Sequence, residues 1–182
     1  MTSTHDTSGG GLSGLNRAKF EQLYTTLERP LYNVVYRWLW DQEEAHDVVQ
    51  EAFMRLWKMR DKVRPQTVEP LLYRIAVNLA SNRRRSRKLR RWLTLDALRT
   101  RPSSDASADS KLSSAQEQRA VRKAVDALPE HLRRVVVMCE FSGLSYRAIG
   151  EILGIPEGTV ASRRHTALKR LRTTMTSWRN AP

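Results

Sequence analysis

The sequence has very little cysteine and no long apolar run, and both shortages exclude whole classes of protein. Its one cysteine, Cys139, cannot form an internal disulfide and has no second thiol to complete a metal site. The longest apolar run, residues 135–139, is far shorter than the ~20 residues needed to span a bilayer. We therefore expect no disulfide framework and no membrane insertion. We interpret Cys139 as a buried core residue, with a redox sensor as the alternative.

The features of an enzyme are also missing from the sequence. It has no Gly-rich loop of the kind that cradles nucleotide phosphates and no pair of metal-ligand clusters. The four histidines are scattered over unrelated segments: His5, His46, His131 and His165. We therefore predict no catalytic residues, no metal, no cofactor and no small-molecule substrate, and we predict that the protein is not an enzyme.

Basic residues, by contrast, are abundant. Lysine and arginine total 32 against 19 aspartates and glutamates, which gives a net charge of +13. The surplus lies within residues 16–100 and 116–182, and the stretch between them is neutral. A field of this sign attracts polyanions, so nucleic acid, an acidic membrane surface and acidic proteins are all candidate partners. Composition alone does not choose among them.

Two polar segments divide the chain. Residues 1–14 and 99–115 are rich in small and polar side chains and have few apolar ones. Such segments bury too little to fold, so we expect a disordered leader at 1–14 and a flexible linker at 99–115. The domains are then residues 15–98 and 116–178. No stretch alternates apolar and polar residues as a half-buried strand does, and the predicted fold class is all-α.

The first domain is predicted to be a small helical bundle. Residues 44–57 show the clearest helical spacing, with apolar side chains at i, i+3, i+4 and i+7. Upstream, residues 20–38 indicate either a helical pair or one helix kinked at Pro30. A third helix begins after Pro70.

The second domain is predicted to have four helices, the last two of which form a helix-turn-helix. Ser145 is placed to cap the third helix, Gly154 allows the turn, and Ile155 fills the junction. The fourth helix presents a polar side suited to a major groove, here called the recognition face: Ser162, Arg163, His165, Thr166, Lys169 and Arg170. Arg164 interrupts its apolar side, where a buried stem would let the head reach a phosphate. The alternative is a solvated helical hairpin with incidental arginines.

Two further faces in the first domain carry opposite character. The helix of residues 44–57 presents an acidic face that suits a basic protein partner: Glu43, His46, Asp47, Gln50 and Glu51. The helix after Pro70 presents a polar stripe suited to bases or phosphates: Arg74, Asn78, Ser81, Asn82 and Arg85. This stripe runs into a basic segment, residues 83–91, which is predicted to track a nucleic-acid backbone. The alternative for both regions is a merely solvated surface.

Taken together, these segments resemble the extracytoplasmic-function (ECF, group 4) sigma factors of the sigma-70 family, two-domain subunits that give bacterial RNA polymerase its promoter specificity. The resemblance rests on DVVQEAFMRLW (47–57), LLYRIAVNLASNRRR (71–85) and the segment from LPEHLRR to ALKRLR (128–172). It is specific because the three segments occur in this order and spacing. It implies a sigma-2-like bundle and a sigma-4-like helix-turn-helix domain.

The resemblance also implies a function, partners and sites. The chain would bind core RNA polymerase in the cytoplasm, recognise and melt promoter DNA, and be restrained by an anti-sigma factor. Docking on the coiled coil of the largest subunit would use Asp47, Gln50, Glu51, Phe53 and Trp57, and the beta flap would be a second contact. The polar stripe would meet the melted minus-ten strand, and the recognition face would read the minus-thirty-five duplex. The alternative is a stand-alone helix-turn-helix regulator.

This sequence departs from the family pattern at two positions. His46 stands where the family usually has an acid, which removes a negative charge from the acidic face. Arg164 replaces a usual aliphatic residue, which would shift the set of base-reading residues by one helical position.

Overall fold

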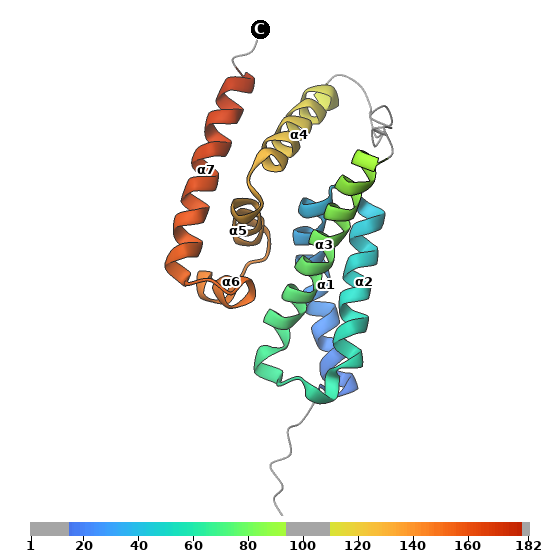
Figure 1. Cartoon of the computed structure of the whole chain (residues 1–182). Helices are drawn as coiled ribbons and strands as arrows, with labels where there is room; N and C mark the ends of the chain where they lie inside the picture. The colour runs from blue at the N-terminus through green and yellow to red at the C-terminus, as the bar shows by residue number, and fades with distance from the viewer. Residues whose placement is uncertain (1–14, 94–109, 180–182) are drawn as a thin grey trace, which may run out of the picture.

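The computed structural model describes residues 15–93 and 110–179, and the regular elements in these two ranges are all helical (Figure 1). The first domain contains α1 (Arg17–Leu39), α2 (Gln42–Lys58) and α3 (Val68–Leu93), with short 3-10 turns at Arg60–Lys62 and Pro65–Thr67. The second contains α4 (Ser110–Ala127), α5 (Glu130–Phe141), α6 (Tyr146–Leu153) and α7 (Glu157–Arg179). The predicted all-α class with two helical domains is confirmed.

The boundary between the linker and the second domain differs from the prediction. Helix α4 begins at Ser110, so residues 110–115 are helical although they were predicted as linker. Residues 99–109 of that segment and the predicted leader, residues 1–14, lie outside the described residues. Residues 110–115 are mostly polar and show no helical spacing of apolar residues, so the sequence did not indicate that they form the first turns of α4.

Helix α1 is one continuous helix that contains Pro30, which settles the two alternatives left by the sequence. Asn16 caps its first turn by accepting a hydrogen bond from the Lys19 backbone N–H at 2.9 Å. The side of α1 that faces the bundle is fully buried at Leu31, Val34 and Val35. Burial of this side offsets the hydrogen bond that proline cannot donate.

Helix α2 begins at a cap made by Asp41, whose carboxylate accepts from the Glu44 backbone N–H at 3.0 Å. Its predicted apolar stripe is confirmed, because six of its seven residues are buried and the seventh, Trp57, is half-buried. Helix α3 starts at Val68, slightly earlier than expected, with Pro70 in its first turn. Proline is tolerated there because a first-turn N–H has no intrahelical acceptor.

The helix-turn-helix of α6 and α7 forms as the sequence predicts. Ser145 caps α6 by accepting from the Ala148 N–H at 3.2 Å, and Gly154 ends it with φ +67°. The turn is tight at Gly150, where an added Cβ would lie 2.6 Å from the carbonyl oxygen of Ile155. That close approach accompanies the hydrogen bond from the Ile155 N–H to the Gly150 carbonyl at 3.0 Å. Glycine is therefore required at 150 for steric reasons.

The two domains pack directly against each other. Figure 1 shows α5 and α6 beside the first bundle, and the contacts are made by α3 with α6 and by α1 with α5. The helix-turn-helix domain therefore covers part of α3, the helix that carries the polar stripe.

Candidate functional site

The acidic face of α2 is open to solvent in this structure. Glu43, His46, Asp47 and Gln50 are exposed, and Glu51 is half-buried. Of the two carboxylates near the middle of the helix, Asp47 is more exposed than Glu51, with 65% of its side chain accessible against 36%. A basic partner can reach this face without any movement of the helix backbones.

Phe53 does not belong to that surface, and its predicted docking contact is corrected here. The side chain is 3% exposed and packs against Phe20 and Tyr24, with ring centroids 6.0 Å and 4.7 Å away. The Trp57 ring contacts the Phe20 ring in a tilted arrangement, with centroids 4.9 Å apart, but Trp57 remains half-buried, so part of its ring is accessible. Phe53 thus holds α1 against α2, because it lies on the same side of the helix as the core residues.

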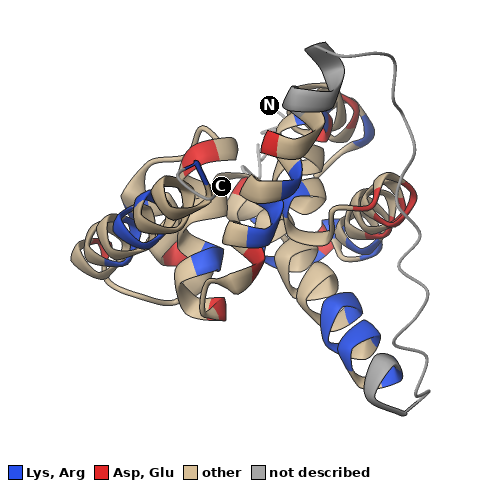
Figure 2. Ribbon diagram, turned by 90° about the horizontal axis from the view of Figure 1, so that it is seen from above, with Lys and Arg blue, Asp and Glu red and all other residues tan. Residues whose placement is uncertain are grey.

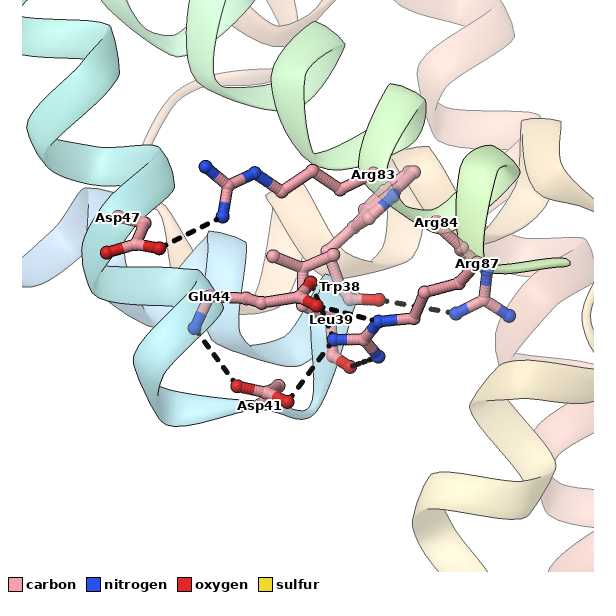
Figure 3. A network of polar contacts seen from close by, with 8 residues as sticks. All are labelled: Trp38, Leu39, Asp41, Glu44, Asp47, Arg83, Arg84 and Arg87. Carbon is pink, nitrogen blue, oxygen red and sulfur yellow. Dashed lines mark hydrogen bonds and ion pairs between the residues drawn. The ribbon is translucent and has the colours of Figure 1, made fainter. Parts of the chain in front are cut away.

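A network of ion pairs joins α2 to the basic end of α3 (Figure 3). Arg83 lies 3.3 Å from Asp47 and 3.6 Å from Glu51. Arg87 donates to Glu44 at 3.0 Å and lies 3.3 Å from Asp41. Arg83 therefore neutralises part of the acidic face from within the same domain, and Arg87 neutralises the carboxylates at the start of α2.

Backbone carbonyls at the end of α1 take part in the same network. Arg84 donates to the Trp38 carbonyl at 3.2 Å, and Arg87 donates to the Leu39 carbonyl at 3.3 Å. Carbonyls in the last turn of a helix lack intrahelical donors and carry partial negative charge, which suits a guanidinium. Arg83 and Arg87 thus bind their own domain, and Arg84 binds both its own domain and Asp126 of α4 at 2.7 Å, whereas the sequence predicted that the whole run tracks a nucleic-acid backbone. Arg85 and Lys88 are exposed.

The polar stripe of α3 is only partly open. Arg74, Asn78, Asn82 and Arg85 are exposed, but Ser81 is 6% exposed and accepts a hydrogen bond from Arg134 of α5 at 3.1 Å. Arg74 donates to the backbone carbonyls of α6 at Ile152, at 3.2 Å, and at Glu151. A groove of about 300 Å³ lies between the domains here, lined by Arg74, Val77, Asn78, Arg134, Ile152, Leu153 and Gly154.

The recognition face lies on α7 as predicted. Arg163 is half-buried and the other five residues are exposed: Ser162, His165, Thr166, Lys169 and Arg170. Thr166, Lys169 and Arg170 also line a groove of about 520 Å³ between α7 and α4. Figure 2 shows basic residues gathered on the C-terminal turns of α3, and further basic positions lie along α7. The first domain thus gathers basic side chains at the C-terminal end of α3, and the second carries them along α7.

Arg164 has a structural explanation that the sequence did not provide. Its guanidinium pairs with the Glu140 carboxylate of α5 at 2.8 Å, so its head meets a carboxylate where we expected a phosphate. Beside it, burial raises the pKa of the Cys139 thiol to about 11, although Arg164 opposes the shift. A thiol with this pKa stays protonated at neutral pH and is a poor nucleophile. Cys139 is half-buried and packs against the core, so it is less enclosed than the buried residue that the sequence predicted.

The described residues were predicted to hold no metal ion and no membrane-spanning segment. Among the described residues, no cluster of three or more His, Cys, Asp or Glu side chains is arranged to hold a metal ion. Within residues 15–93 and 110–179, no helix is both long and apolar enough to cross a membrane.

Comparison with known proteins identifies the family. Residues 23–90 match the family model of sigma-70 region 2, and residues 118–171 match that of sigma-70 region 4. The ECF RNA polymerase sigma factor SigW of Bacillus subtilis is 32% identical over 162 residues, which cover 84% of this chain and 87% of that protein. The chain belongs to the ECF sigma factors.

Other relatives of this sigma factor agree. The ECF sigma factor SigE of Mycolicibacterium smegmatis is 35% identical over 144 residues, which cover 78% of this chain and 56% of that protein. The structure of RpoE from Bartonella quintana, solved with the anti-sigma factor NepR, superposes with a TM-score of 0.66 at 22% identity and covers 86% of this chain and 96% of that one. CnrH, solved with the cytosolic domain of CnrY, gives 0.67 at 21%, covering 89% and 90%. These structures show the same fold.

Sequence patterns did not reveal which carboxylates pair with the arginines of α3. Arg83 and Asp47 are 36 positions apart, and Arg84 and Asp126 are 42 apart. Helical periodicity links residues three or four positions apart, so it carries no information on such pairs. The only signal available was the coincidence of an acidic face and a basic run within one domain.

Proposed function

We propose that this sigma factor binds core RNA polymerase in the bacterial cytoplasm, directs it to promoters and opens the DNA there, with no catalytic chemistry of its own. The observation that carries the proposal is the pairing of both sigma-70 regions in one chain, with an exposed acidic face on the first and an exposed recognition face on the second. A stand-alone regulator would leave the first domain without a role.

The acidic face is the proposed docking surface for the coiled coil of the largest polymerase subunit. Asp47, Gln50 and Glu51 present acceptors there, and the accessible part of Trp57 adds apolar area at one end. A basic helix suits this surface because complementary charge speeds encounter and fixes register. Arg83 already pairs with both carboxylates, so docking would exchange an internal cation for the partner's.

The two DNA elements are assigned to different helices. The exposed amides of Asn78 and Asn82 can donate to and accept from the edges of unpaired bases, and Arg85 can pair with a phosphate. The recognition face of α7 fits a major groove, as the second helix of a helix-turn-helix does. The beta flap is the proposed second polymerase contact, by family resemblance.

An anti-sigma factor is the proposed regulator. RpoE and CnrH, which share this fold, were solved in complex with the anti-sigma factor NepR and with the cytosolic domain of CnrY, respectively. We expect an equivalent protein to bind this chain and to compete with core polymerase for it.

The proposal is tested by run-off transcription with bacterial core polymerase on promoters selected from random sequence. Adding the chain should produce initiation at defined positions, and Asp47→Arg should abolish both initiation and capture of core polymerase. Asp61→Arg makes the same charge change at an exposed site in the 3-10 turn that follows α2 and should retain activity. If the wild-type chain yields no specific initiation at any selected sequence, and the free chain binds duplex DNA tightly, the stand-alone regulator replaces this proposal.

A further inference from the structure

Arg83 differs from the neighbouring arginines of α3 in what it binds. Its guanidinium contacts two carboxylates of the acidic face, that of Asp47 at 3.3 Å (Figure 3) and that of Glu51 at 3.6 Å. Arg84 and Arg87 also donate to backbone carbonyls at the end of α1, whereas Arg83 has no backbone acceptor among the described residues. The partners of Arg83 are therefore the same carboxylates that the proposed function assigns to polymerase docking.

The contacts of Arg83 are also looser than those of Arg87. The nitrogen–oxygen distances are 3.3 Å and 3.6 Å for Arg83, against 2.6 Å for the pair of Arg87 with Glu44. The Arg83 side chain is 32% exposed and that of Asp47 is 65% exposed. Ion pairs with this exposure stabilise a fold very little, because water and salt screen them and two long side chains must be held in place. Arg83 can thus leave the acidic face at small cost to the fold.

Glu51 is the carboxylate most occupied by cations of its own domain. Its Oε1 atom lies 2.6 Å from Arg55, and its Oε2 atom lies 3.6 Å from Arg83. Asp47 contacts Arg83 through Oδ2, and its Oδ1 atom has no partner in the part of the chain that the structure describes. A partner's cation can therefore pair directly with Asp47, but at Glu51 it must compete with two internal guanidinium groups.

From these contacts we propose that Arg83 is an internal competitor of the basic protein partner. It occupies Glu51 in the free chain and so lowers the affinity of the acidic face for that partner. Asp47 supplies the primary contact, and displacement of Arg83 determines how much Glu51 adds. A partner with clustered basic side chains can replace Arg83, whereas a partner with one isolated cation gains only the contact with Asp47. The inference rests on the proposed docking surface.

The inference is tested by the affinity of the full chain, with fluorescein at its amino terminus, for core polymerase in a fluorescence anisotropy titration. Arg83→Met removes the competing charge and keeps an unbranched side chain that suits a helix. It should tighten binding about twofold to fivefold, the factor expected when a partly exposed ion pair no longer has to be broken. Lys62→Met removes the same charge at an exposed site of the first domain whose side chain makes no ion pair among the described residues, and it should tighten binding less.

A double-mutant cycle with Glu51 separates competition from a general effect of charge. Glu51→Gln should weaken polymerase binding only slightly in the wild type, where Arg83 occupies the carboxylate. In the Arg83→Met background the same change should weaken binding about twofold to fivefold more. Equal effects of Glu51→Gln in the two backgrounds overturn the inference, as does an equal gain from Lys62→Met and Arg83→Met. Weaker binding by Arg83→Met also overturns it, because Arg83 would then orient the carboxylates for the partner.

Urea unfolding and the Asp47→Arg variant keep the remaining outcomes distinct. Arg83→Met should unfold at the urea midpoint of the wild type because its contacts are partly exposed. A lower midpoint with unchanged affinity would assign Arg83 to the fold and overturn the inference. A wild-type chain that does not bind core polymerase overturns the proposed function and the inference with it. A chain that loses binding on Asp47→Arg but is unaffected by Arg83→Met overturns the inference alone.

Discussion

Gly150 provides the sharpest test of how the helix-turn-helix is built. Gly150 has an ordinary helical backbone that any residue could adopt, yet a Cβ there would lie 2.6 Å from the Ile155 carbonyl oxygen. The obstacle is backbone and cannot rotate away. Gly150→Ala must therefore push the turn outward, disturbing the hydrogen bond between the Ile155 N–H and the Gly150 carbonyl.

The magnitude follows from two opposing effects. Overpacking of a buried site costs ~1–3 kcal/mol of unfolding free energy. Replacing glycine by alanine within a helix returns about 0.5–1 kcal/mol, through higher helix propensity and a less flexible unfolded chain. The sum is a net loss of up to about 2.5 kcal/mol for the second domain. In a domain of this size a loss at the upper end of that range lowers Tm by roughly 10–20 °C.

Gly158 gives the matched control. It lies in the first turn of α7, and a Cβ added there would meet nothing within 4 Å. Gly158→Ala should therefore leave the second domain unchanged or stabilise it by up to about 1 kcal/mol. Both variants would be compared by calorimetry and urea unfolding of the whole chain. Equal stability of Gly150→Ala and Gly158→Ala would refute the reasoning, because the two differ only in the space around the new methyl group.

Three further predictions test single side chains. Phe53→Ala should destabilise the first domain by ~3–5 kcal/mol in urea unfolding because the ring is in the core, whereas Met54→Ala, at a position that is 52% exposed, should change stability by less than ~0.5 kcal/mol. Cys139 should react slowly with iodoacetamide at pH 7 and faster as the pH approaches its pKa of about 11. Because folding raises this pKa, the protonated thiol contributes to the free energy of unfolding below the ordinary pKa of 9.0, and that contribution is lost as the pH rises from 9.0 through 11. Arg170→Met should lower the salt dependence of duplex binding by about one counterion, and Arg164→Met should leave it unchanged because its partner is Glu140; equal salt slopes for the two would contradict this assignment.

Much of the fold was predictable because it depends on neighbours in the chain. The apolar spacing of 44–57 defines α2, and the cap at Ser145 and the turn at Gly154 define α6, all through contacts within a few residues. The resemblance to sigma factors rests on the same local segments. Most residues of the acidic face and of the recognition face are exposed, with Glu51 and Arg163 half-buried, because a helix side without apolar residues has little to bury.

Other features depended on the tertiary structure. Helical spacing placed Phe53 in the buried stripe, whereas the family resemblance placed it in the docking set. The α1 rings of Phe20 and Tyr24 lie over it and show that it belongs to the core. Arg164 pairs with Glu140 because α5 and α7 cross at that point. In both cases the deciding neighbour is distant in the sequence.

The sequence by itself determined that this chain is helical and basic, with two sigma-70 regions and a helix-turn-helix, because composition, periodicity and capping act over a few residues. Only the tertiary structure decided which charges remain available. It pairs Arg83 with Asp47, places Arg74 on the end of α6 and buries Ser81 beneath Arg134. The physical reason is that the availability of a charge depends on which groups approach it in space, and the packing of the two domains determines those groups.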